Sequence, residues 1–132
     1  MNQAAITRCH AVLAILAMML VIPHPASAHH GWADFDPMAE VTLYGVVMDF
    51  HYVNPHSVVE FTVTDDKGQV RLWQGEFGSP NELTRKGWTV TTLEAGAKIT
   101  ITGHPSKNGA PALHVSSIVL ATGKEMKLYG GR

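Results

Sequence analysis

Hydrophobic and polar residues alternate along several short stretches of the chain, with the period of two that is typical of β-strands. Such stretches, rich in β-branched and aromatic residues, cover residues 40–53, 57–64, 69–77, 98–103 and 112–120, and a shorter one covers 125–129. In 57–64, for example, Val59, Phe61 and Val63 share one face. The pattern therefore predicts five main strands and a short sixth. Gly45 inside the first stretch indicates a bulge or a sharp coil.

One short helix is expected between the third and fourth strands. The sequence Ser79-Pro80-Asn81-Glu82 is a capping box with proline at the first helical position, and Gly87 is a good stop. Three strands, a helix and two strands follow one another in an OB-fold, a small Greek-key barrel. We therefore predict an all-β fold with one short helix, OB-like, with a short extra C-terminal strand. A different small barrel or sandwich is the alternative.

The beginning of the chain has the features of a secretory signal. Arg8 is followed by an uninterrupted apolar run of 12 residues, and Ala26-x-Ala28 places small residues at a cleavage site. That run is too short to span a bilayer, which needs about 20 helical residues. We expect residues 1–28 to be a signal peptide, 29–39 an irregular arm and 40–132 the barrel domain. The expected location is the periplasm or the extracellular space, with no membrane anchor.

Composition excludes several kinds of chemistry. The one cysteine, Cys9, lies in the predicted signal peptide, so the mature chain would contain no disulfide and no thiolate ligand. The formal net charge is −1, and no basic patch is evident, so a nucleic-acid partner is not expected. Neither a Gly-x-Ser-x-Gly elbow nor a His-Glu-x-x-His motif is present. We therefore assign no catalytic residue, and enzymatic activity is not favoured.

Several short motifs occur together in the predicted mature chain. They are the His29-His30 start, Val41-x-Leu43-x-Gly45-x-Val47, Asn54-Pro55-His56, Gly78-Ser79-Pro80-Asn81 and Arg85-x-Gly87-Trp88. In this combination the chain resembles a family of small exported bacterial proteins that is catalogued as a domain of unknown function. The resemblance implies an exported, soluble, single-domain protein. It implies no activity, so no site residue is transferred from it.

Cleavage after Ala28 would leave His29 at a free amino terminus, where its α-amine and one ring nitrogen can chelate a single metal ion. The α-amine has a pKa of about 7.7 to 8.0, so a metal displaces its proton near neutral pH. His30, His51 and His56 are candidate third ligands. We favour His56, because it lies in the loop after the first strand, on the rim where OB-folds bind ligands. Among divalent ions the affinity order favours Cu(II), although imidazole also suits Zn and Ni.

Other interpretations of the same residues remain open. The histidine pair can be a solvated tail, or it can bind metal only adventitiously. An alternative function is the binding of a small molecule, glycan or protein partner by an aromatic face, without metal. The residues predicted for that face are Trp32, Tyr52, Trp73, Glu76 and Trp88.

Most of the side chains in these sets also have a purely structural interpretation. The rings can fill the core, and Glu76 is expected to form an ion pair with Arg71 or Arg85. We further expect His104 and His114 to be surface residues and Met48 to be part of the core.

Overall fold

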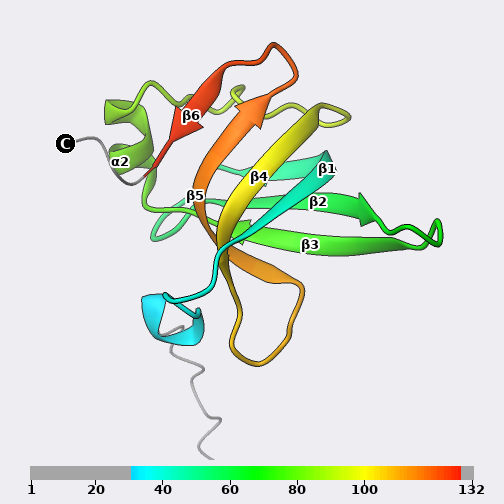
Figure 1. Ribbon diagram of the computed structural model, residues 1–132. Coiled ribbons are helices and arrows are strands. Elements are labelled where there is room, and N and C mark those ends of the chain that lie inside the picture. Colours follow the sequence, from blue (N-terminus) through cyan, green and yellow to red (C-terminus); the bar gives the residue numbers. More distant parts are fainter. Residues whose placement is uncertain (1–30, 129–132) are drawn as a thin grey trace, which may run out of the picture.

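The structure is a computed structural model that describes residues 31–128. Six strands with one α-helix between the third and fourth follow one another as predicted, and a 3₁₀ helix that was not predicted lies in the arm before them (Figure 1). The elements are η1 (Gly31–Asp34), β1 (Val41–His51), β2 (Val58–Thr64), β3 (Val70–Glu76), α2 (Pro80–Arg85), β4 (Lys98–Pro105), β5 (Ala112–Leu120) and β6 (Glu125–Lys127). The main departures from prediction are β1, which begins one residue later and ends two residues earlier, β4, which runs two residues further, and β6, which ends two residues earlier.

The strands form a closed five-stranded barrel. Their order is β3-β2-β1-β4-β5, and β3 and β5 pair in parallel to complete the ring. The sixth strand pairs with β5 outside that ring. The predicted OB-like Greek-key arrangement, including the extra C-terminal strand, is therefore confirmed. Figure 1 shows α2 beside one end of the barrel and the β2–β3 hairpin extending at the other.

The long first strand belongs to both halves of the barrel. Gly45 and Val46 each pair with β2 on one side and with β4 on the other. A Cβ atom at Gly45 would lie 2.6 Å from Cδ2 of Phe61, so glycine is required for the close approach of the two strands. The shift in register comes later, between Val47 and Asp49. Gly45 thus marks the coil, while the bulge lies at Met48.

The core fills the barrel and the space below α2. Its fully buried side chains include Phe61, Ile101, Leu113, Ile118 and Trp88. The prediction that Met48 belongs to the core is wrong, since 52% of it is exposed. Met48 follows the inward-facing Val47, so the alternation of β1 already places it on the outer face; the bulge at Met48 then makes Phe50, and not Asp49, the next inward residue.

The capping box predicted for α2 is present. The Glu82 carboxylate accepts a hydrogen bond from the Ser79 backbone N–H at 3.0 Å, and the Ser79 side chain accepts one from the Glu82 N–H at 3.4 Å. Pro80 occupies the first turn. Reciprocal capping thus links the first turn of this six-residue helix to the residue before it in both directions. No helix within residues 31–128 is long and apolar enough to cross a membrane.

The arm before β1 is fixed to the loop between β4 and β5. Phe35 is 6% exposed and forms an isolated bridge with Ser106. Asp36 donates its N–H to the Pro105 carbonyl at 2.9 Å, and the Lys107 N–H donates to the Asp34 carbonyl at 3.0 Å. These contacts hold η1 against one end of the barrel. The predicted signal peptide, His29 and His30 lie outside the described residues.

Candidate functional site

A pocket of about 290 Å³ lies where η1, the β1–β2 loop, the end of β3 and β5 meet. Closure of the barrel creates it, because the parallel pairing of β3 with β5 places Glu76 opposite His114. The loop after β1 adds His56, and η1 adds Trp32. The lining residues are Trp32, His56, Glu76, Phe77, Gly78, Glu82 and His114.

His56 and Glu76 form the polar centre of this pocket. Nδ1 of His56 lies 2.5 Å from Oε1 of Glu76, and their side chains are 41% and 22% exposed. The structure gives this contact as an ion pair, and the buried Oε1 of Glu76 accepts no hydrogen bond within residues 31–128. The other ring nitrogen of His56, Nε2, makes no hydrogen bond within the same residues, so it is available to a ligand. Glu76 therefore places its carboxylate against one edge of the imidazole.

The partner of Glu76 differs from the one predicted. Neither Arg71 nor Arg85 forms the expected ion pair with it. Arg71 lies over the ring of Trp73, 5.8 Å from the centroid, and Arg85 donates from Nε to the Asn81 carbonyl at 3.2 Å. The prediction of an ion pair for Glu76 is therefore correct only in kind, because the base that it contacts is His56.

His114 is the site residue that sequence reasoning missed. It was expected at the surface, yet it is only 4% exposed. Rings from the arm cover it: its centroid lies 4.2 Å from that of Trp32 and 5.7 Å from that of Phe35. Burial lowers the pKa of His114; nearby Glu76 opposes this by raising it, whereas His104 and His56 lower it further.

A third imidazole lies next to this group. His104 is the cross-strand partner of His114, and its Nδ1 lies 2.7 Å from the Ala39 carbonyl oxygen. Its ring centroid is 5.4 Å from that of Trp32. His104 and His114 lie on two strands that are predicted to be neighbours, but their proximity can be recognised only once the register of these strands is known. Within residues 31–128, no three metal-ligating side chains are grouped closely enough to hold an ion by themselves.

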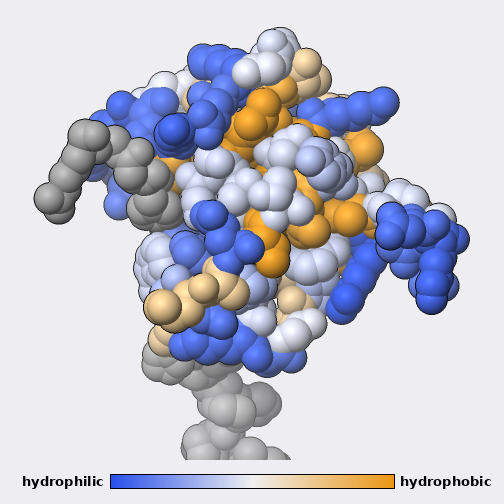
Figure 2. All heavy atoms as spheres, viewed as in Figure 1, coloured by the Kyte–Doolittle hydropathy of each residue, from blue (hydrophilic) through white to orange (hydrophobic). Residues whose placement is uncertain are grey.

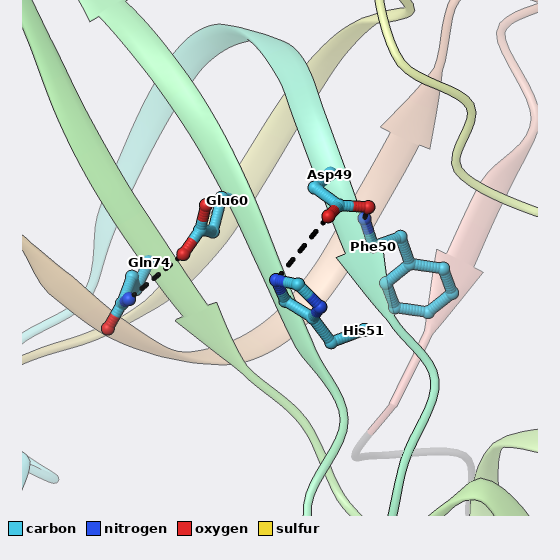
Figure 3. A network of polar contacts seen from close by, with 5 residues as sticks. All are labelled: Asp49, Phe50, His51, Glu60 and Gln74. Atoms are coloured by element: carbon cyan, nitrogen blue, oxygen red, sulfur yellow. Dashed lines mark hydrogen bonds and ion pairs between the residues drawn. The ribbon is translucent and has the colours of Figure 1, made fainter.

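His51, another candidate ligand, lies apart from the pocket lining. It is exposed on β1, with Nε2 3.6 Å from the carboxylate of Asp49. Figure 3 shows this pair beside a second polar contact, in which Gln74 donates to Glu60 across β3 and β2 at 3.3 Å. The structure therefore does not bring His51 together with His56.

The residues of the predicted aromatic face occupy different parts of the molecule. Trp88 is 1% exposed and packs in the core at 5.2 Å from Phe77, measured between ring centroids. The Tyr52 hydroxyl donates to the Pro80 carbonyl at 2.9 Å and so holds α2. Trp73 lies on β3 under Arg71. Of the five, only Trp32 and Glu76 line the pocket.

The fold and the site together define a small OB-type barrel that carries a histidine–carboxylate pocket at one end. Residues 17–113 match the family of unknown function DUF6152, and the chain belongs to that family. The resemblance found from the motifs is thereby confirmed. A comparison with curated proteins finds no match.

Proposed function

We propose that this protein is an exported binding module that holds Cu(II), or another divalent metal ion, at the pocket of His56 and Glu76. In this proposal the ligands are the α-amine and a ring nitrogen of His29 together with Nε2 of His56, with His30 as a further donor. The observation that carries the proposal is the contact of 2.5 Å between His56 and Glu76.

A histidine paired with a carboxylate is an arrangement that recurs at protein-bound metals. A ligating histidine usually donates its other N–H to a carboxylate, which fixes the ring and increases its basicity as a ligand. Glu76 is largely shielded from solvent, so its charge acts on His56 with little screening. An exposed histidine without such a partner, in contrast, gains neither orientation nor basicity.

Covalent connectivity favours the N-terminal histidines as the remaining ligands. His29 is three residues from Trp32, whose indole lines the pocket, so their Cα atoms are at most about 11 Å apart. An amine and two imidazoles form an all-nitrogen set, which suits Cu(II) best among divalent first-row ions. With no thiolate in the mature chain, a site selective for Cu(I) has less support.

The alternative of a metal-free aromatic face has less support from the geometry. Trp88 is enclosed by the core and Tyr52 is engaged with α2, so neither can contact a ligand without a rearrangement. Trp32 does remain 46% exposed at the pocket. A planar ligand can therefore stack there, but on a single ring.

The experiment is a Cu(II) titration of protein that begins at His29, monitored by electron paramagnetic resonance. We expect one tightly bound ion with nitrogen ligands, and a loss of at least about tenfold in affinity for His56→Ala. Placing one extra residue before His29 converts the amine to an amide and has a similar effect. His51→Ala is the matched control and leaves binding unchanged. Weak binding that is equal in all four proteins would refute the proposal.

The same titration has a predictable pH dependence. Protons compete with the metal for imidazole nitrogens, whose pKa in a free side chain is about 6.5. Affinity is therefore expected to fall as the pH decreases through that value. Binding that stays constant from pH 8 to pH 5 would contradict ligation by histidine.

A further inference from the structure

We propose that the groove around Tyr44 and Lys98 is a second binding site, whose ligand is an anionic saccharide of the uronate class. The groove has a volume of about 460 Å³, within the range of about 300 to 1,000 Å³ in which small-molecule sites fall. It is formed by β1, β4 and the ends of β2 and β5. Its residues are Tyr44, Gly45, Val46, Thr62, Thr64, Lys98, Ile99, Thr100, Val119, Leu120 and Ala121.

Strand pairing explains why these side chains gather. Tyr44 of β1 pairs with Thr100 of β4, and Thr100 pairs in turn with Val119 of β5. Figure 2 shows apolar and weakly polar residues over the region of β1 and β4, whereas hydrophilic residues surround the β2–β3 turn. The lining thus combines apolar and hydroxyl-bearing side chains on a rigid part of the barrel.

Four hydroxyl groups border the groove without internal partners. No hydrogen bond connects the hydroxyls of Tyr44, Thr62, Thr64 or Thr100 to any other residue of 31–128. The Tyr52 hydroxyl, in contrast, donates to the Pro80 carbonyl. Each free hydroxyl can donate one hydrogen bond and accept others, so the groove matches a ligand that carries several hydroxyls.

The charge of the groove is positive. Lys98 is exposed and forms no ion pair within the described residues, and the lining contains no acidic side chain. Lys127, in contrast, lies 3.6 Å from the carboxylate of Glu125. An unpaired ammonium group beside neutral donors favours a carboxylate over a cation or a neutral group.

The ring of Tyr44 is the third feature of the groove that fits a uronate. Tyr44 is 75% exposed, which makes it one of the most exposed large side chains on the barrel. Its flat apolar surface, together with Val46 and Val119, can cover the apolar face of a sugar ring while the hydroxyls bind its edge. A uronate carries all three features at once: an apolar ring face, several hydroxyls and one carboxylate.

This site is independent of the proposed metal site. None of the residues that line the groove also lines the pocket of His56 and Glu76. The proposal therefore survives even if the protein binds no copper, and the reverse also holds. A chelator in the buffer separates the two sites experimentally.

The test uses the whole mature chain, with EDTA present and trigalacturonate as the probe, followed by two-dimensional NMR of the backbone amides. We expect saturable shifts confined to residues 44–46, 62–64 and 98–100. Lys98→Ala should weaken binding about fivefold or more, because a charge-assisted hydrogen bond is lost. Lys67→Ala removes an exposed lysine outside the lining and serves as the matched control.

Further comparisons determine which feature of the probe is recognised. Tyr44→Phe keeps the stacking surface and should retain most of the affinity, whereas Tyr44→Ala should lose it. Maltotriose, a neutral saccharide, should bind at least about fivefold more weakly than trigalacturonate. The proposal is overturned if shifts do not saturate, if Lys67→Ala weakens binding as much as Lys98→Ala, or if only an acidic peptide binds.

Discussion

At the scale of single residues, the pocket depends on side chains that owe their properties to their neighbours. His56 lies in a loop that the sequence identified, because Asn54-Pro55 interrupts the strand pattern before it. Its partner Glu76 could not be predicted, since the two residues belong to segments that only the fold brings together. The ring that covers His114 likewise comes from an arm 82 positions earlier in the chain. Residue types were thus visible in the sequence, but their pairings were not.

Replacement of Glu76 tests the role assigned to it. Glu76→Gln keeps the size and an acceptor oxygen but removes the negative charge beside His56. We expect the Cu(II) affinity of the mature protein to fall about tenfold or more, with the barrel intact. Competition titration measures the affinity, and nitrogen NMR of the imidazole reports which ring nitrogen carries the proton in each protein. Glu60→Gln, a change on the outside of β2, is the control. Equal affinities for the two variants would exclude a positioning role.

Burial of His114 predicts how stability varies with pH in the metal-free protein. Burial lowers its pKa below the value of 6.5 expected in the unfolded chain, so the unfolded state binds more protons as the pH falls below that value. The free energy of unfolding should therefore decrease from pH 7.5 to pH 5.5. His114→Phe should reduce this dependence, and His51→Ala should not. Urea denaturation at both pH values measures it; an unchanged slope in His114→Phe would contradict the prediction.

At the scale of elements, the hydrophobic pattern was sufficient to predict the strands that have one buried face. The alternation in β2 predicted its inward residues, and the capping box predicted the start of α2. Met48 was misplaced because residues 46–48 form a continuous apolar run, in which hydrophobicity alone does not show which face each side chain takes. The bulge after Val47, which makes Phe50 the next inward residue, is determined by pairing with β2, and the sequence of β1 alone does not contain it.

Replacement of Gly45 tests whether β1 and β2 can approach closely only with glycine at this position. In Gly45→Ala the new Cβ atom would meet Cδ2 of Phe61 at 2.6 Å and the backbone oxygen of Thr62 at 2.9 Å. We expect a loss of about 1 to 3 kcal/mol in the free energy of unfolding, typical of overpacking. Thermal and urea denaturation measure this loss.

A double substitution identifies the cause of that loss. Phe61→Leu removes the ring and destabilises the barrel by itself, but it also provides space beside residue 45. The combined variant should therefore lose less than the sum of the two single variants. Strict additivity would show that contact with the ring of Phe61 is not the source of the strain.

At the scale of the whole molecule, the pairing that closes the barrel also forms the candidate site. The three residue pairs that join β3 to β5 include Glu76 with His114, so the ring cannot close without bringing these residues together. The fold class was predictable, because the order of strands and helix is a local property of the chain. The sequence named His56, Trp32 and Glu76 as candidates for two different sites, but their meeting in one pocket, and the presence of His114 there, depend on contacts between distant segments.

Export and metal binding are coupled if His29 supplies its amine. In the full-length chain, the nitrogen of His29 belongs to a peptide bond and cannot act as the amine ligand; the proposed cleavage after Ala28 would create that ligand. We therefore expect residues 29–132 to bind Cu(II) at least tenfold more tightly than the full-length chain, because a chelate ring forms only in the former. Mass spectrometry of exported protein determines whether His29 is the first residue, and parallel titrations compare the affinities. If the precursor binds equally well, the ligands lie within the barrel and maturation has no part in forming the site.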